Sequence, residues 1–121
     1  MDEATLHSKI SNKHYSPLVI RRYATDFGVM FVGIISDDDL NRLDEIILPV
    51  VKKSVVKTIE EARTLTGKVC EMLKITFTKV EGVAVVSYFD KLMVSSLWGD
   101  FMNHESCRIE LYELINVMTK V

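Results

Sequence analysis

The sequence predicts a single α+β domain, in which a mostly antiparallel sheet is packed by a long central helix and by a C-terminal helix. Two observations lead to this fold class. Apolar side chains alternate with polar ones, or run unbroken, in two groups of short stretches, and they recur every three or four residues in the stretch between. The resulting order is ββα followed by βββα, and 121 residues suffice for one such core.

The first two strands are expected in residues 18–24 and 29–35. The earlier stretch is rich in β-branched and aromatic side chains, which favour strands. The later one, Val29–Ile35, is apolar throughout, which is typical of a strand covered on both faces. Residues 1–16 are polar and are interpreted as an N-terminal arm, so the domain itself spans residues 17–121.

The central helix is expected to begin after Ser36, a residue type that caps helix N-termini, with Asp37–Asp39 in its first turn. Pro49 should break or kink the helix, because proline removes one backbone hydrogen bond. Apolar residues then continue at helical spacing from Val50 to Leu73. The sequence leaves open whether this helix runs through Gly67.

Three further strands are expected in residues 75–80, 83–89 and 92–97. The first of them alternates apolar and polar residues, as a half-buried strand does. Asp90-Lys91 is expected to form the tight turn between the other two. A loop at Trp98–Met102 then leads to the C-terminal helix, which carries a broad apolar stripe.

The charge is nearly balanced along the whole chain and uneven within it. The net charge of −2 provides no overall field that would attract nucleic acid or anionic lipid. Residues 49–80 hold seven basic and three acidic side chains, a net of +4, whereas residues 31–48 hold five acidic side chains and one arginine, a net of −4. These blocks are expected to be solvated helix faces, and a functional interpretation is docking of acidic against basic faces of two copies.

The expected compartment is the cytoplasm. Cys70 and Cys107 stand alone, without metal-ligand spacing, and are interpreted as buried free thiols of a reduced protein. Residues 1–12 lack the apolar core of a signal peptide, and the longest uncharged stretch, residues 27–36, is too short to span a bilayer. We therefore expect no contact with a membrane.

No catalytic residue, cofactor or metal is assigned from the sequence. The acidic run Asp37–Asp39 follows an apolar strand, where Mg²⁺ and phosphate sites often occur, but helix capping also accounts for it. His104 and Cys107 lie one helical turn apart, and no recognised catalytic arrangement surrounds them. The sequence leaves enzymatic activity undecided and leans against it.

Two partner classes remain. The favoured one is a protein partner or a second copy, bound through the long helix or through the Trp98–Met102 loop, whose large apolar side chains are common at interfaces. The residues assigned to it are Trp98, Phe101 and Met102. The alternative is a nucleic acid on a basic helix face near two strand arginines. That face holds Lys52, Lys53, Lys57, Arg63, Lys68 and Lys74, and the strand holds Arg21 and Arg22.

Overall fold

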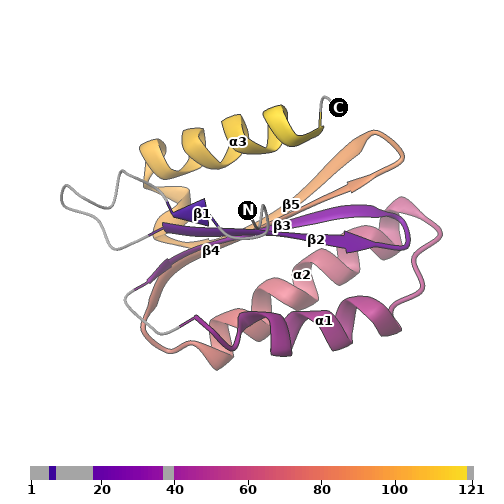
Figure 1. The fold of residues 1–121 in the computed structure, drawn as a ribbon, viewed down its shortest axis with the longest axis horizontal. Helices are drawn as coiled ribbons and strands as arrows, with labels where there is room; N and C mark the ends of the chain where they lie inside the picture. Colours follow the sequence, from indigo (N-terminus) through magenta and orange to yellow (C-terminus); the bar gives the residue numbers. More distant parts are fainter. Residues whose placement is uncertain (1–5, 8–17, 37–39, 120–121) are drawn as a thin grey trace.

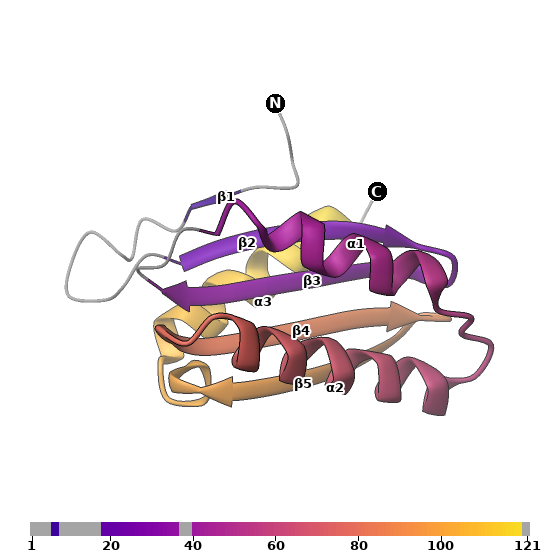
Figure 2. The same cartoon turned by 90° about the horizontal axis from the view of Figure 1, so that it is seen from below.

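The computed structural model describes residues 6–7, 18–36 and 40–119. These form a five-stranded antiparallel sheet with α1 and α2 on one face and α3 on the other (Figures 1 and 2). The strands lie side by side in the order β1-β2-β3-β4-β5. The elements are β1 (Leu6–His7), β2 (Leu18–Thr25), β3 (Gly28–Ser36), α1 (Leu43–Lys53), α2 (Ile59–Thr76), β4 (Val80–Phe89), β5 (Leu92–Gly99), the 3₁₀ turn η2 (Asp100–Met102) and α3 (Glu105–Thr119). The predicted α+β class, with one mostly antiparallel sheet, is confirmed.

Both predicted hairpins form. In the first, β2 and β3 pair in register from Leu18 opposite Ile35 to Thr25 opposite Gly28. In the second, β4 and β5 are joined by Asp90 and Lys91, whose φ angles of 50° and 67° match a two-residue turn that follows the twist of the strands. Of the predicted N-terminal arm, the described part pairs with the sheet as β1, and the rest lies outside the described residues.

The strand predicted at residues 75–80 is wrong. Helix α2 continues to Thr76, and β4 begins only at Val80. Leu73 and Phe77 are both buried and lie four residues apart, which is helical spacing, while Ile75 between them is 72% exposed. The first alternating residues, Ile75 and Thr76, therefore belong to the end of a helix, and Ile75, its last apolar residue, faces solvent.

The single long helix is also wrong, because α1 and α2 are separate. Pro49 lies inside α1 and does not end it; the chain leaves the helix at Ser54 and is extended there. A new helix starts at the N-cap Thr58, whose hydroxyl accepts a hydrogen bond from the Glu61 amide at 3.1 Å, while the Glu61 carboxylate accepts one from the Thr58 amide at 3.1 Å. Helix α2 then runs through Gly67 without interruption.

The predicted cap at Ser36 is not the start of a helix. Ser36 is the last residue of β3 and is buried, and α1 begins at Leu43 after Arg42 in the N-cap position. Asp37–Asp39 lie outside the described residues.

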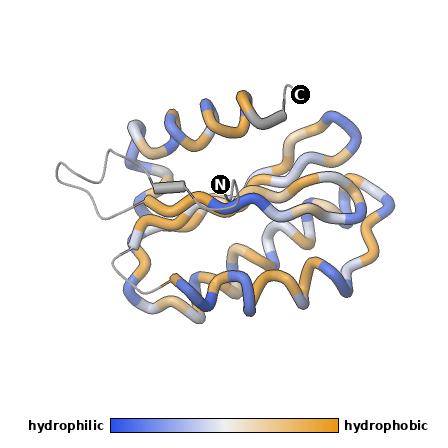
Figure 3. The backbone as a smooth tube through the Cα atoms, viewed as in Figure 1, coloured by the Kyte–Doolittle hydropathy of each residue, from blue (hydrophilic) through white to orange (hydrophobic). Residues whose placement is uncertain are grey.

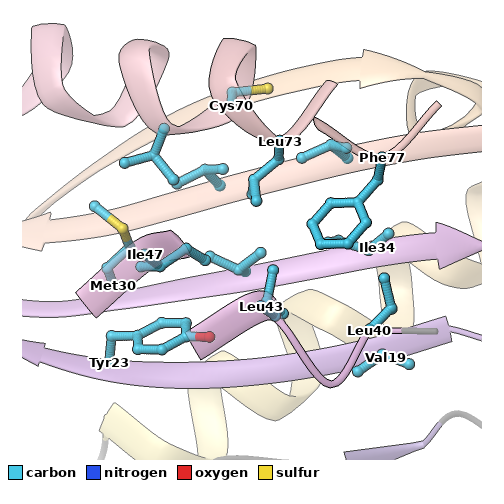
Figure 4. Close-up of a cluster of buried hydrophobic side chains, with 14 of the residues drawn as sticks. Val19, Tyr23, Met30, Ile34, Leu40, Leu43, Ile47, Cys70, Leu73 and Phe77 are labelled. Atoms are coloured by element: carbon cyan, nitrogen blue, oxygen red, sulfur yellow. The ribbon is translucent and has the colours of Figure 1, made fainter. Parts of the chain in front are cut away.

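Apolar side chains fill two layers, one on each face of the sheet. Hydrophobic residues run along the strands and alternate with hydrophilic ones along the helices (Figure 3). The layer under α1 and α2 is the larger, and Figure 4 shows its side chains converging from the two helices and from β2 and β3. The layer under α3 is built around Phe31, Phe101 and Leu111. Because both faces are covered, β3 and β4 are buried over most of their length, which leaves the edges of the sheet as its accessible backbone.

Candidate functional site

The outer side of β5 is an open sheet edge. Strand β5 pairs with β4 on one side and has no described strand on the other. None of its eight residues is charged or a proline, and its pairing with β4 has no register shift. Natural sheets commonly protect an edge with lysine, proline or a bulge, since unpaired backbone groups there can pair with another chain. This edge carries none of these devices.

The first end of β5 exposes two large apolar side chains, and the other end holds two that are half-buried. Leu92 and Met93 directly follow the turn into the strand, and they are 56% and 49% exposed. Further along, Leu97 and Trp98 are half-buried. Leu92, Val94, Ser96 and Trp98 point to the α2 face, whereas Met93, Ser95 and Leu97 point to the α3 face, because side chains alternate along a strand.

Helix α2 lies along β5 and runs in the same direction (Figure 2). Thr66 donates a hydrogen bond to Ser87 of β4 at 2.8 Å, and Ser87 is opposite Val94 of β5. One turn later, the Cys70 thiol lies beside Ser96, whose hydroxyl lowers the pKa of the thiol by less than burial raises it. Another turn later, the Lys74 ammonium lies 5.2 Å from the centre of the Trp98 ring. The helix therefore packs over β4 and β5 on this face of the sheet.

One flank of α2 faces outward beyond β5. It carries the exposed charges of Glu60, Arg63 and Glu71, together with Lys74 and Gly67. The Arg63 side chain is 61% exposed and pairs with Glu60 at 3.4 Å; Lys74 is 37% exposed and lies 3.9 Å from Glu71. Apart from its chain neighbours and the backbone of its own helix, no described atom lies within 4 Å of where a Cβ on Gly67 would be. We call this flank together with β5 the β5–α2 edge.

The structure separates the three residues predicted to bind a partner. Trp98 is half-buried in β5 beneath Lys74. Phe101 is fully buried in the layer under α3. Met102 ends η2, and its side chain lies outside the described residues. The large apolar residues of this segment therefore do not form one surface, and Phe101 belongs to the core.

The structure also separates the predicted basic residues. Arg21 and Arg22 are consecutive in β2 and point to opposite faces of the sheet. Arg21 is 12% exposed and binds Asp44 of α1 at 2.9 Å, so its charge is already neutralised. Lys52 and Lys53 are exposed at the end of α1, Lys57 is exposed in the connection to α2, and Lys68 is exposed on α2. The two arginines thus contribute nothing to a common basic surface.

A second exposed apolar area lies on the α3 face of the same hairpin. Tyr88 and Met93 of the hairpin and Ile109, Tyr112 and Ile115 of α3 line an open groove of about 480 Å³. Ile109 is 49% exposed, and Val117 further along α3 is 66% exposed. The groove adjoins the β5–α2 edge through Met93, which belongs to both.

Three polar side chains form a partly buried cluster between β2 and α1. Asp44 accepts hydrogen bonds from the Tyr23 hydroxyl at 2.7 Å and from the Arg21 guanidinium at 2.9 Å. Burial raises the pKa of Asp44, but the hydrogen bonds from Tyr23 and Arg21 outweigh it, so that the pKa lies below its ordinary value of 3.8. Burial and the neighbouring Asp44 carboxylate raise the pKa of Tyr23 far above 10. Both shifts keep the cluster in its paired state at neutral pH, which is a structural role.

This cluster predicts a loss of stability in acid. Because the folded pKa of Asp44 is depressed, its stabilisation is fully present above the unfolded pKa near 3.8 and is lost as the pH falls through the folded value. We expect urea midpoints of the wild type to drop as the pH falls from about 5 to about 2, and Asp44→Asn to remove part of that drop. Glu45→Gln, at an exposed position on the same turn, is the matched control. An equal acid dependence in both variants would contradict the assignment.

The two thiols show the chemistry of core residues. Burial, more than the nearby Glu71, raises the pKa of Cys70, and burial followed by the charge of Glu110 raises the pKa of Cys107. The Cys107 sulfur lies 3.9 Å from Nδ1 of His104, which joins the two residues noted in the sequence. An activated cysteine needs a lowered pKa, so this pair lacks the electrostatics of a nucleophile and its base.

Sequence reasoning missed the β5–α2 edge and most of the polar contacts behind it. Thr58-x-x-Glu61 is a capping-box pattern, and it could have located the start of α2. The contacts of Thr66 with Ser87 and of Cys70 with Ser96 join residues more than 20 positions apart, and no local pattern indicates them.

Neither a metal site nor a membrane-spanning helix is found in the part of the chain that the structure describes. No group of three or more His, Cys, Asp or Glu side chains there is arranged to hold a metal ion. Of the described helices, none combines the length and apolar character that crossing a membrane requires. In comparisons with known proteins, the chain matches no family model and no curated sequence.

Proposed function

We propose that this chain is a protein-interaction or regulatory domain, without a catalytic role, that works as a homodimer formed through the β5–α2 edge. The observation that carries the proposal is the unprotected β5. An eight-residue edge strand without charge, proline or bulge is a template for pairing with another strand. The exposed Leu92 and Met93 add apolar area that association would remove from water.

The other edge of the sheet supports the choice of β5. There β2 is paired with β1 at Val19 and Ile20, and beyond that pairing it carries Arg21 and Arg22. Charged side chains on an edge strand oppose pairing with a second sheet. The two edges of one sheet thus differ in the way expected if one of them is used for association.

We also propose a cytoplasmic location for the protein. Cys70 and Cys107 are free and buried. Unpaired thiols persist in a reducing compartment, which agrees with a cytoplasmic regulatory or scaffolding role.

Sedimentation equilibrium over micromolar concentrations tests the proposal. We expect a monomer–dimer equilibrium for the wild type and a shift to monomer for Ser95→Lys, which places a lysine in the middle of the exposed edge. Ser106→Lys makes the same charge change at an exposed position of α3 and should leave the dimer intact. A wild type that stays monomeric throughout would overturn the proposal, as would a Ser95→Lys variant that dimerises like the control.

A further inference from the structure

The edge of β5 accepts only certain partners because its backbone groups alternate in direction. The two-residue turn places Phe89 and Leu92 in a hydrogen-bonded pair, so the backbone groups of Leu92 point to β4. The groups of Met93, Ser95 and Leu97 then point outward. A second β5 that runs antiparallel must match outward groups with outward groups, so each of these residues pairs with an outward-pointing residue of the second copy.

We infer that two copies pair β5 against β5 around a two-fold axis at Ser95, with their α2 helices side by side at Gly67; this inference rests on the proposed homodimer. In this register Ser95 meets its own copy, and Met93 meets Leu97 of the second copy. Both hydrogen-bonded pairs lie on the α3 face of the extended sheet. On the α2 face, Leu92 meets Trp98 of the second copy in a close, non-hydrogen-bonded pair.

This register gives each exposed apolar residue of β5 an apolar neighbour. Leu92 and Met93, which are 56% and 49% exposed, face Trp98 and Leu97 of the second copy. Moving the axis by one residue to Ser96 would instead place Met93 opposite Gly99 and leave Leu92 beyond the strand. The apolar pattern of β5 is therefore self-complementary about Ser95.

The charges on the outward flank of α2 are also self-complementary. Their centre of symmetry, at Gly67, lies at nearly the same height along the edge as Ser95. Arg63 and Glu71 lie four residues before and after Gly67, and Glu60 and Lys74 lie seven residues before and after it. In an antiparallel pair of α2 helices centred on Gly67, each of these positions faces the opposite charge on the second copy. The internal Glu60–Arg63 and Glu71–Lys74 pairs would then join into two alternating networks of four charges.

The strand and the helix point to the same axis. Thr66 is level with Val94 through Ser87, and Cys70 is level with Ser96, so that Ser95 lies level with the helical turn between Thr66 and Cys70. That turn contains Gly67. Two features far apart in the sequence therefore place their centres of symmetry at one point of the β5–α2 edge.

The spacing of the helices also fits. Strands are about 4.8 Å apart, so a helix over the space between β4 and β5 lies about 4.8 Å from an axis just outside β5. The two α2 helices would then be about 10 Å apart, within the range of packed helices. Gly67, with open space at its Cβ position, stands where the two helices would approach each other.

Charge reversal tests the helix register. Arg63→Glu and Glu71→Arg should each weaken homodimerisation by about tenfold, since two favourable surface pairs become repulsive. An equimolar mixture of the two variants should recover dimers, because the two substituted positions then face each other with opposite charges and the native Arg63 and Glu71 form the other pair across the axis. The double variant in one chain should also dimerise. Sedimentation measures all four samples, and circular dichroism checks that each is folded.

A cysteine at the axis tests the strand register. Paired residues of this kind have Cα atoms about 5.5 Å apart, within disulfide range, so Ser95→Cys should form a covalent dimer under mild oxidation. Wild type, with its buried Cys70 and Cys107, and Ser106→Cys on exposed α3 should not. A dimeric wild type without Ser95→Cys cross-linking or charge recovery would overturn the register and leave the proposed homodimer standing. A monomeric wild type would overturn both.

Discussion

Phe101→Ala should destabilise the domain by about 3–5 kcal/mol, the cost of removing a fully buried phenylalanine. The ring lies against the backbone of β3, because a Cβ added at Gly33 would lie 3.1 Å from it. The Phe101 backbone lies against β4, because a Cβ added at Gly82 would lie only 2.5 Å from the Phe101 amide nitrogen. Leu111 of α3 closes the same space. Backbone atoms and packed core side chains cannot move far enough to fill the cavity that the truncation leaves. The loss of unfolding free energy should therefore be large. Urea unfolding monitored by circular dichroism measures it.

Ile109→Ala is the matched control for Phe101. Ile109 is also apolar and also belongs to the α3 side, but it is 49% exposed. Its truncation should therefore cost less than about 1 kcal/mol. A small effect of Phe101→Ala, comparable to that of the control, would mean that Phe101 is not seated in the core and would restore it as a partner-binding residue.

The outcome separates two interpretations of one segment. Trp98, Phe101 and Met102 were grouped in the sequence because large apolar residues in a connection are common at interfaces. In the fold they divide between a strand and a 3₁₀ turn that covers two glycines. A loss of stability without a loss of association from Phe101→Ala, and the reverse from Ser95→Lys, would place the interface on β5 and the core at Phe101.

The sheet was predictable because its signals are local. The unbroken apolar stretch Val29–Ile35 indicated a strand covered on both faces, and β3 is buried from Met30 to Ser36. The turn Asp90-Lys91 was placed correctly between two apolar stretches, although it lacks the glycine that such turns favour. In both cases, the pattern of side chains over fewer than ten residues was enough.

The helices were less predictable because two periods fit the same residues. Ile75, Thr76 and Phe77 alternate like a strand, and Leu73 and Phe77 repeat like a helix. Only the packing of Leu73 and Phe77 into one core decides between them. Pro49 was expected to interrupt the helix. A proline on the exposed side of α1 removes one hydrogen bond, however, and the helix continues past it.

The pairing at the candidate interface was not predicted from the sequence. The docking suggested there was between the acidic block of residues 31–48 and the basic block of residues 49–80, whereas the proposed interface pairs acidic and basic residues that all lie in α2. Which strand lies at the edge depends on the order of strands in the sheet, and that order is set by pairings between residues far apart in the chain. The alignment of Gly67 with Ser95 follows from the same pairings, so it is visible only in the folded chain.

Gly82→Ala should also be strongly destabilising, by about 3 kcal/mol, the upper end of the range for overpacked sites. The added methyl would lie 2.5 Å from the amide nitrogen of Phe101 and 3.2 Å from that of Asp100. Both neighbours are backbone atoms of η2, so no side-chain rotation can relieve the overlap, and the turn must move away from β4. Chemical unfolding in the Ser95→Lys background measures the effect without a contribution from association.

Gly67→Ala is the control for Gly82→Ala and should change stability in the opposite direction. Gly67 lies within α2 and has open space at its Cβ position, so alanine should stabilise the monomer by about 0.5–1 kcal/mol through its helix propensity. The same chemical change thus has opposite signs at two glycines, because one position is filled by the backbone of η2 and the other faces outward beyond β5. If Gly82→Ala were as harmless as Gly67→Ala, η2 would not be packed against β4, and Phe101 would lose the support that makes it a core residue.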